Sequence, residues 1–485
     1  MEAPDSLSRP MVTAIDRRQR IDLIETWGGG VEIVRILTLG FFGVLMWLSI
    51  SHDDIALPGA RLADEGASIY VARLMGLKVL DLLALIAAGG TLLYLVLRRR
   101  IEVSDYHRSV GLMLAVYAVA GLIGFIYAYV FDYPLERWYQ DAQQTLYFAL
   151  FFLMTFHLTE SRRSWQVLFI LFLLFLGLKN IIILERLFSG VGKVLGVFGV
   201  RTTQSSDAAV FPALFAIGIP LLLHPRVSAW LKAFLAASLT VYLFNALISF
   251  GRTVWVVLLL LTVYYLIAMD RTTRRSFVAV IIATSLVALA LVLTLFPRFF
   301  ALASWKFQTI FDWSVRGDRS NATRTLEVLN IFSRLFEHGA LFHGMGLGAW
   351  WDDRYYTLLP DAGSGFTGKS RYYMAHLWVV EQMLKVGLIG VAVYWYAVLR
   401  IVRTAFRHWR VLPVSSIERT LLFGLSAAFL AIMLTNTDLV KVYLLMGIVL
   451  GLLARFAVFV DAGTPPVSIL LRHSGPNVQL SRSAE

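Results

Sequence analysis

Apolar residues in this chain occur in runs of about twenty, separated by short stretches that contain charged residues, Pro or Gly. As an α-helix, a run of that length crosses the hydrocarbon core of a bilayer, which is about 30 Å thick. Lipid offers no partner for unpaired backbone groups, so each crossing segment must be helical. We therefore predict an all-α polytopic membrane protein with about twelve transmembrane helices. The predicted helices cover residues 34–50, 74–97, 109–130, 142–159, 164–184, 208–223, 229–249, 252–269, 276–296, 377–400, 418–436 and 439–455.

The charges between these helices alternate along the chain. Basic residues gather in every second loop, as expected for loops that stay in the cytoplasm. These residues are Arg98, Arg99, Arg100 and Arg108; Arg162 and Arg163; Arg226 and Lys232; Arg271, Arg274 and Arg275; and Arg400, Arg403, Arg407 and Arg410. The polar stretch before the first helix carries Arg17, Arg18 and Arg20 and lacks the short apolar core of a signal peptide. We therefore expect both termini in the cytoplasm.

The longest stretch between two predicted helices covers residues 297–376, and the alternation places it outside, in the periplasm of a Gram-negative cell. Loops of this length are usually either functional or disordered, and this one is too rich in aromatic residues and Gly to be disordered. We predict a partly helical, functional loop between the ninth and tenth helices. The predicted organisation is a cytoplasmic segment at 1–33, nine helices at 34–296, the periplasmic loop at 297–376, three helices at 377–456 and a cytoplasmic tail at 457–485.

Composition supports a membrane protein and excludes several other classes. Of the 485 residues, 58% are hydrophobic and only 16% are charged, whereas soluble domains have about a quarter charged. The formal net charge of +12 is scattered over short loops and forms no basic patch, so we expect no nucleic-acid partner. The chain has no cysteine, which excludes disulfides, thiolate zinc sites and cysteine nucleophiles.

Cations on the outer side of the membrane are the most informative residues, because the insertion bias disfavours them there. Arg201, Arg252 and Arg324 are predicted close to this boundary, and His376 stands where the long loop re-enters the membrane. A planar guanidinium can hold a phosphate in bidentate fashion and does not lose its charge. The simpler alternative is that each arginine anchors its helix to lipid headgroups or pairs with a nearby acid, and that His376 caps a helix.

Two pairs of acidic residues are further candidates for a site. Asp53 and Asp54 follow the first helix and would suit a metal, whereas Asp352 and Asp353 follow two tryptophans in the long loop. We assign Trp351, Asp352 and Asp353 to sugar binding; solvated loop residues and an interfacial tryptophan are the alternative readings. Glu381 and Lys385 stand four residues apart, so we expect an internal ion pair within one helix.

The order and spacing of four segments between residues 200 and 390 resemble the O-antigen ligase and O-antigen polymerase superfamily of bacterial membrane glycosyltransferases. The segments are an arginine before small and polar residues; a Ser-x-x-Arg turn that opens a helix; an arginine-led helix followed by Gly-x-Gly; and a histidine at a helix start followed by Gly-x-x-Gly. The matching residues are Arg201; Ser249 and Arg252; Arg324, Gly344, Gly346 and Gly348; and His376, Gly387 and Gly390. One departure is Leu377, where the family often has Asn or Ser.

The resemblance implies a GT-C-like membrane enzyme that transfers a glycan from undecaprenyl pyrophosphate to a sugar hydroxyl on the periplasmic face of the bacterial inner membrane, with no cofactor and no metal. By the same resemblance, Arg201, Arg252 and Arg324 hold the pyrophosphate and His376 is the catalytic base. Its partners are the lipid-linked oligosaccharide, membrane lipid, and an acceptor glycan that is a growing chain or lipid A-core. We favour a repeat-unit polymerase of O-antigen or exopolysaccharide; an O-antigen ligase is the alternative.

A secondary transporter or lipid flippase would also have many helices and a few charges within the membrane. Such folds usually contain inverted repeats and Gly/Pro-broken helices at matching positions of two halves, and neither is evident in the sequence. An assembly partner without enzymatic activity is a third class, which the sequence does not exclude.

Overall fold

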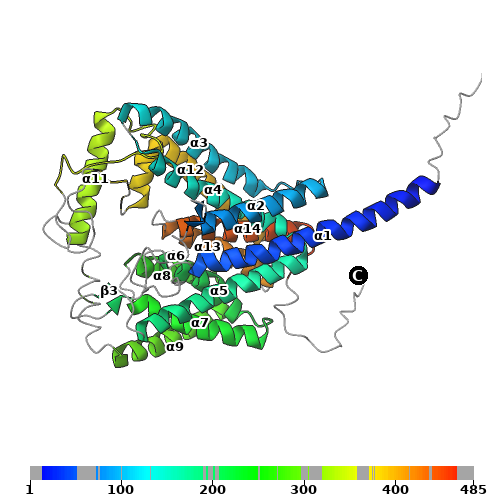
Figure 1. Cartoon of the computed structure of the whole chain (residues 1–485). Coiled ribbons are helices and arrows are strands. Elements are labelled where there is room, and N and C mark those ends of the chain that lie inside the picture. Colours follow the sequence, from blue (N-terminus) through cyan, green and yellow to red (C-terminus); the bar gives the residue numbers. More distant parts are fainter. Residues whose placement is uncertain are drawn as a thin grey trace, which may run out of the picture.

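The computed structural model describes residues 14–51, 73–74, 77–99, 101–131, 133–188, 193–194, 200–201, 207–248, 252–269, 271–295, 304, 308, 319–357, 371–373, 375, 377–413, 416–435 and 440–466. Over these residues the chain is almost entirely helical (Figure 1). The helices are α1 Ala14–Ser51, α2 Val79–Arg98, α3 Asp105–Phe131, α4 Leu135–Leu158, α5 Arg162–Phe188, α6 Asp207–Leu223, α7 Ala229–Ile248, α8 Arg252–Ala268, α9 Arg271–Leu295, α11 Arg319–Glu337, α12 Trp378–Val411, α13 Ile417–Leu434 and α14 Val440–Asp461. Two short antiparallel hairpins pair β1 Arg73–Leu74 with β2 Leu77–Lys78, and β3 Lys193–Val194 with β4 Val200–Arg201.

The all-helical, polytopic prediction is confirmed: a helix lies in each of the twelve predicted segments, and α11 lies within the long loop. In the described part of the chain, nine helices are long and apolar enough to cross a membrane. Two further apolar stretches, Pro212–Leu223 and Thr253–Ala268, are shorter. The count of twelve spans thus stays a prediction, because α6 and α8 have only 17 residues each and α4, although it has 24 residues, is not among the nine candidate spans.

Helix α14 lies at the centre of the bundle, packed mainly against α4 and α13. In its most apolar stretch 94% of the residues are buried, whereas the corresponding value for α9 is 11%. The outward faces of the peripheral helices carry large apolar side chains, for example Leu92 on α2 and Leu122 on α3, both more than 60% exposed. Such a surface suits lipid and not water.

Ion pairs tie several helix ends together at one end of the bundle. Arg407 near the end of α12 lies 3.7 Å from Asp105 at the start of α3, and His408 lies 3.1 Å from Asp461 at the end of α14. Helices α3 and α12 are antiparallel neighbours, and the turn directly after α11 contacts the far end of α3, where the rings of Phe131 and His338 meet at 4.7 Å. The described part of the long loop therefore lies at the opposite end of the bundle from these ion pairs (Figure 1).

Candidate functional site

Helix α12 is interrupted at Gly387, whose backbone angles (φ 68°, ψ 179°) are essentially restricted to glycine. The break frees backbone groups that a membrane helix normally satisfies internally, and a segment of the long loop replaces the lost partners. Met345 and Gly346 donate their N–H groups to the carbonyls of Leu384 and Lys385, at 2.7 and 2.9 Å. Leu388 and Ile389 donate to the carbonyls of Leu341 and Phe342, at 2.9 and 3.1 Å. We call residues 340–348 the glycine crossing.

The glycine crossing also touches the backbone of α3. Leu347 donates its N–H to the carbonyl of Ala120 at 3.0 Å, and a Cβ atom on Gly346 would lie 2.1 Å from the backbone nitrogen of Gly124. Gly344, Gly346 and Gly348 all have positive φ angles, between 73° and 83°. These glycines, which the sequence marks as a Gly-x-Gly turn, are therefore required by both conformation and close backbone packing.

Beneath the crossing lies a buried charge triad. The Nζ atom of Lys385 contacts Oε1 of Glu381, as the i,i+4 spacing predicts, and also lies 2.9 Å from Oδ1 of Asp141 on α4. Glu381 and Lys385 are both at most 1% exposed. Gly348 donates its N–H to Oδ2 of Asp141 at 2.8 Å, so the triad links α4, α12 and the crossing. The i,i+4 pair was predictable; Asp141 was not, because it comes from another helix.

A second polar group, the Trp350 cluster, lies between α11 and the start of α12 and comprises Tyr133, Arg334, Trp350, Asp352 and Arg371. The guanidinium carbons of Arg334 and Arg371 lie 3.6 and 4.8 Å from the centre of the Trp350 ring. Arg334 is 2% exposed, and its Nη1 lies 3.7 Å from Oδ2 of Asp352. Two cations on one indole ring beside a carboxylate form a compact site of cation–π and ionic contacts.

Four buried polar atoms of this cluster have no hydrogen-bond partner among the described residues: Tyr133 Oη, Arg334 Nε, Trp350 Nε1 and Asp352 Oδ1. Buried polar groups are almost always hydrogen-bonded, so such a set in one cluster marks a place suited to a polar ligand. Three of the four atoms are donors and the carboxylate oxygen is an acceptor, a combination that matches hydroxyl and phosphate groups.

Burial determines the protonation of the Trp350 cluster. It raises the pKa of the Tyr133 hydroxyl, which therefore keeps its proton and remains a donor near neutral pH. Burial also lowers the pKa of Arg334 from its ordinary value, and the Asp352 carboxylate acts in the opposite direction. An arginine starts from so high a pKa that Arg334 stays charged near neutrality. The cluster therefore presents a permanent cation and a neutral phenol.

Neither a known protein family nor a curated protein matches this chain. In the ranges that the structure describes, no three His, Asp or Glu side chains group closely enough to hold a metal ion.

The predicted sugar-binding residues have different surroundings. The ring of Trp351 is fully buried and stacks on Tyr372 at 4.6 Å, and the two residues exchange backbone hydrogen bonds of 2.8 and 2.7 Å. Asp352 belongs to the Trp350 cluster, and Asp353 is partly exposed beside it. Successive side chains of an extended strand point to opposite sides. Trp351 thus faces the core, whereas Trp350 contacts Arg334.

The predicted pyrophosphate and catalytic residues are described only in part. Arg324 lies on α11, partly buried and about 15 Å along the helix axis from Arg334. Arg201 ends β4 and Arg252 begins α8, but their side chains lie outside the described residues. His376 lies outside them as well, immediately before the described start of α12. The structure therefore neither brings these four residues together nor separates them.

The sequence interpretation missed the importance of Arg334. On α11, Glu327, Asn330 and Arg334 follow one another at the spacing of a single helix face, and each is at most 2% exposed. Asn330 holds the backbone of Tyr356 through two hydrogen bonds, of 2.7 and 2.9 Å. A buried polar stripe on an otherwise amphipathic helix is the signal that would have indicated this face of α11 as part of a site.

Proposed function

We propose that this protein is a membrane glycosyltransferase of the bacterial inner membrane. It transfers a glycan from undecaprenyl pyrophosphate to a sugar hydroxyl on the periplasmic side, and it acts as a repeat-unit polymerase of O-antigen or exopolysaccharide. Arg201, Arg252 and Arg324 bind the pyrophosphate in this proposal, and His376 is the base. A ligase that uses lipid A-core as acceptor would employ the same chemistry. Polymerase and ligase are therefore distinguished by which molecule receives the glycan in vitro, a growing chain or lipid A-core.

The observation that carries the proposal is the Trp350 cluster at the outer-loop end of a polytopic bundle. Its unpartnered donors and its permanent cation suit a ligand rich in hydroxyl and phosphate oxygens. Arginine can also replace a divalent ion in neutralising a pyrophosphate leaving group, and electrostatic stabilisation of this kind is often the largest catalytic contribution. In the proposal Asp352 and Asp353 contact the sugar, and Trp351 supports them from the core.

The direct test is transfer by the purified protein, using a lipid-linked oligosaccharide donor and a glycan acceptor with chelator present and no nucleotide sugar. We expect chain extension by the wild type. His376→Ala should lower turnover on the order of 100-fold, the range for losing general-base help, while donor affinity changes much less. The control is His408→Gln, because His408 lies at the other end of the bundle.

Two results would contradict this proposal. If the wild type moves the lipid-linked glycan across the membrane of proteoliposomes but forms no glycosidic bond, the protein is a transporter. If His376→Ala retains transfer within a few fold of wild type, the base is another residue, and Asp352 and Asp353 become the next candidates.

Arg334→Lys provides a separate test of the Trp350 cluster. We expect transfer to fall at least about tenfold, because a compact ammonium cannot reproduce a planar group stacked on indole. Thermal unfolding measured in parallel distinguishes lost function from lost fold. Arg274→Lys is the matched control, since Arg274 is exposed at the start of α9 and donates to the carbonyl of Met269, away from the cluster. Equal activity of the two variants would remove the cluster from the proposed site.

A further inference from the structure

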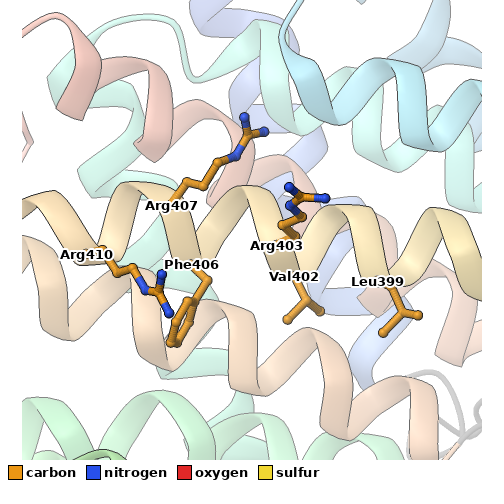
Figure 2. A pocket seen from close by; sticks show the side chains of 6 residues that line it. All are labelled: Leu399, Val402, Arg403, Phe406, Arg407 and Arg410. Carbon is orange, nitrogen blue, oxygen red and sulfur yellow. The ribbon is translucent and has the colours of Figure 1, made fainter.

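The last three turns of α12 contain a groove of about 490 Å³ (Figure 2). It lies beside the ion pair of Arg407 with Asp105, at the opposite end of the bundle from the Trp350 cluster. Its lining comes from a single helix and consists of three arginines and three apolar residues. They are Leu399, Val402, Arg403, Phe406, Arg407 and Arg410. The proposed glycan transfer does not use this groove.

The groove runs from an apolar end to a cationic end. Leu399 is 64% exposed, and Arg410 follows about 16 Å further along the axis of the same candidate membrane span. Figure 2 shows Leu399, Val402 and Arg410 pointing to one side, with Arg410 folded against the Phe406 ring, and the ends of Arg403 and Arg407 turned to the other side. Positions 403 and 410 are seven residues apart, so their backbones share one face of the helix. The guanidinium carbon of Arg410 lies 4.8 Å from the centre of that ring. This arrangement fits the boundary between acyl chains and headgroups.

The positive charge in the groove is largely uncompensated. Arg407 lies 3.7 Å from Asp105 of α3, and both side chains are at least 50% exposed. Arg403 and Arg410 form no ion pair with any residue that the structure describes. The other nearby carboxylate, Asp461 of α14, faces His408 on a different side of α12. Two guanidiniums thus remain available to an anion.

We propose that this groove binds an anionic phospholipid, with the headgroup phosphate held by Arg403 and Arg410 and an acyl chain along Leu399 and Val402. Planar guanidiniums suit phosphate oxygens, and basic pockets beside membrane helices are suited to anionic headgroups. A free anion would gain nothing from the apolar half of the groove, so the lipid is the better match. In the orientation predicted from the loop charges, the site faces the cytoplasmic leaflet.

The experiment is native mass spectrometry of the full-length protein with dioleoylphosphatidylglycerol and, separately, dioleoylphosphatidylcholine. We expect the wild type to retain phosphatidylglycerol in preference to phosphatidylcholine. The double variant Arg403→Gln/Arg410→Gln should bind it about 25-fold more weakly, since each arginine near the surface contributes about fivefold. The matched control is Arg400→Gln, because Arg400 is on the same helix but does not line the groove. Thermal unfolding of each variant verifies the fold.

Four outcomes would overturn this proposal. The first is equal retention of the two lipids by wild type. The second is an equal loss of phosphatidylglycerol binding in the control and in the double variant. The third is displacement of the lipid by inorganic phosphate at millimolar concentration, which would identify a site for a free anion. A dimer in wild type that the double variant converts to monomer would assign the groove to a second copy of the chain, and would also overturn lipid binding.

Discussion

Replacing Gly346 with alanine is expected to prevent α12 and the long loop from assembling. The added Cβ would lie 2.1 Å from the backbone nitrogen of Gly124 and 2.8 Å from the carbonyl of Ala120, and backbone atoms cannot yield as a flexible side chain does. The φ angle of 83° adds strain for any residue with a Cβ. Overpacking and strain together should cost more than about 3 kcal/mol. The measurement is the yield and melting temperature of monodisperse protein in detergent.

Two other glycines separate the two causes of this destabilisation, backbone strain and steric overlap. Gly339 also has a positive φ angle, 60°, but nothing lies within 4 Å of its added Cβ, so Gly339→Ala should show only the strain, about 1 kcal/mol. Gly89 lies within α2 with open space around it, and Gly89→Ala should be neutral or slightly stabilising. If Gly346→Ala melts at the same temperature as Gly339→Ala, the crossing does not pack against α3.

Lys385→Met is expected to destabilise the protein by about 3–5 kcal/mol, because it leaves Glu381 and Asp141 without their shared cation. Glu381 is fully buried, so water cannot replace the lost ion pair. A buried carboxylate deprived of its cation either keeps its charge in a low-dielectric environment or takes up a proton, and both alternatives are costly. Thermal unfolding at neutral pH measures the effect. The control is Arg354→Met, which removes an exposed cation paired with Glu337 and Asp352 and should change stability by less than about 1 kcal/mol.

Removing the negative charge of Glu381 should recover part of the stability that Lys385→Met loses. In a Lys385→Met background, Glu381→Gln is expected to raise the melting temperature, whereas Glu381→Gln alone should lower it. Such opposite signs in a double-mutant cycle are the mark of direct coupling. Additive effects would mean that the two side chains contribute to stability independently, which would contradict the triad.

The positions of the helices follow from the sequence, but two of their properties do not. The predicted tenth helix, 377–400, corresponds to α12, which continues to Val411 and breaks at Gly387. The break depends on hydrogen bonds with residues about forty positions earlier, and no local pattern encodes them. Likewise α4 begins at Leu135, ahead of the predicted 142–159, because its polar first turns pack on the glycine crossing through Trp138 and Asp141.

The candidate site was predictable in part. Asp352 was selected for its chemistry and does belong to a cluster with unpartnered buried atoms. The neighbouring tryptophan was assigned from its type alone, and the orientation of Trp351 toward the core depends on its bridge with Tyr372. Arg334 was missed because an arginine on an amphipathic helix usually faces water, and its burial becomes visible only when Trp350 is placed beside it.

The break at Gly387 also imposes an order on biogenesis. When α12 enters the bilayer during synthesis, the carbonyls of Leu384 and Lys385 have no partner until residues 345 and 346 lie beside them. Unpaired carbonyls in lipid cost several kcal/mol each, so the crossing must be present as α12 inserts. The surface that receives the crossing is α3, which is made much earlier. Insertion of α12 is thus a closing step, in which a segment made just before it comes to lie between two helices.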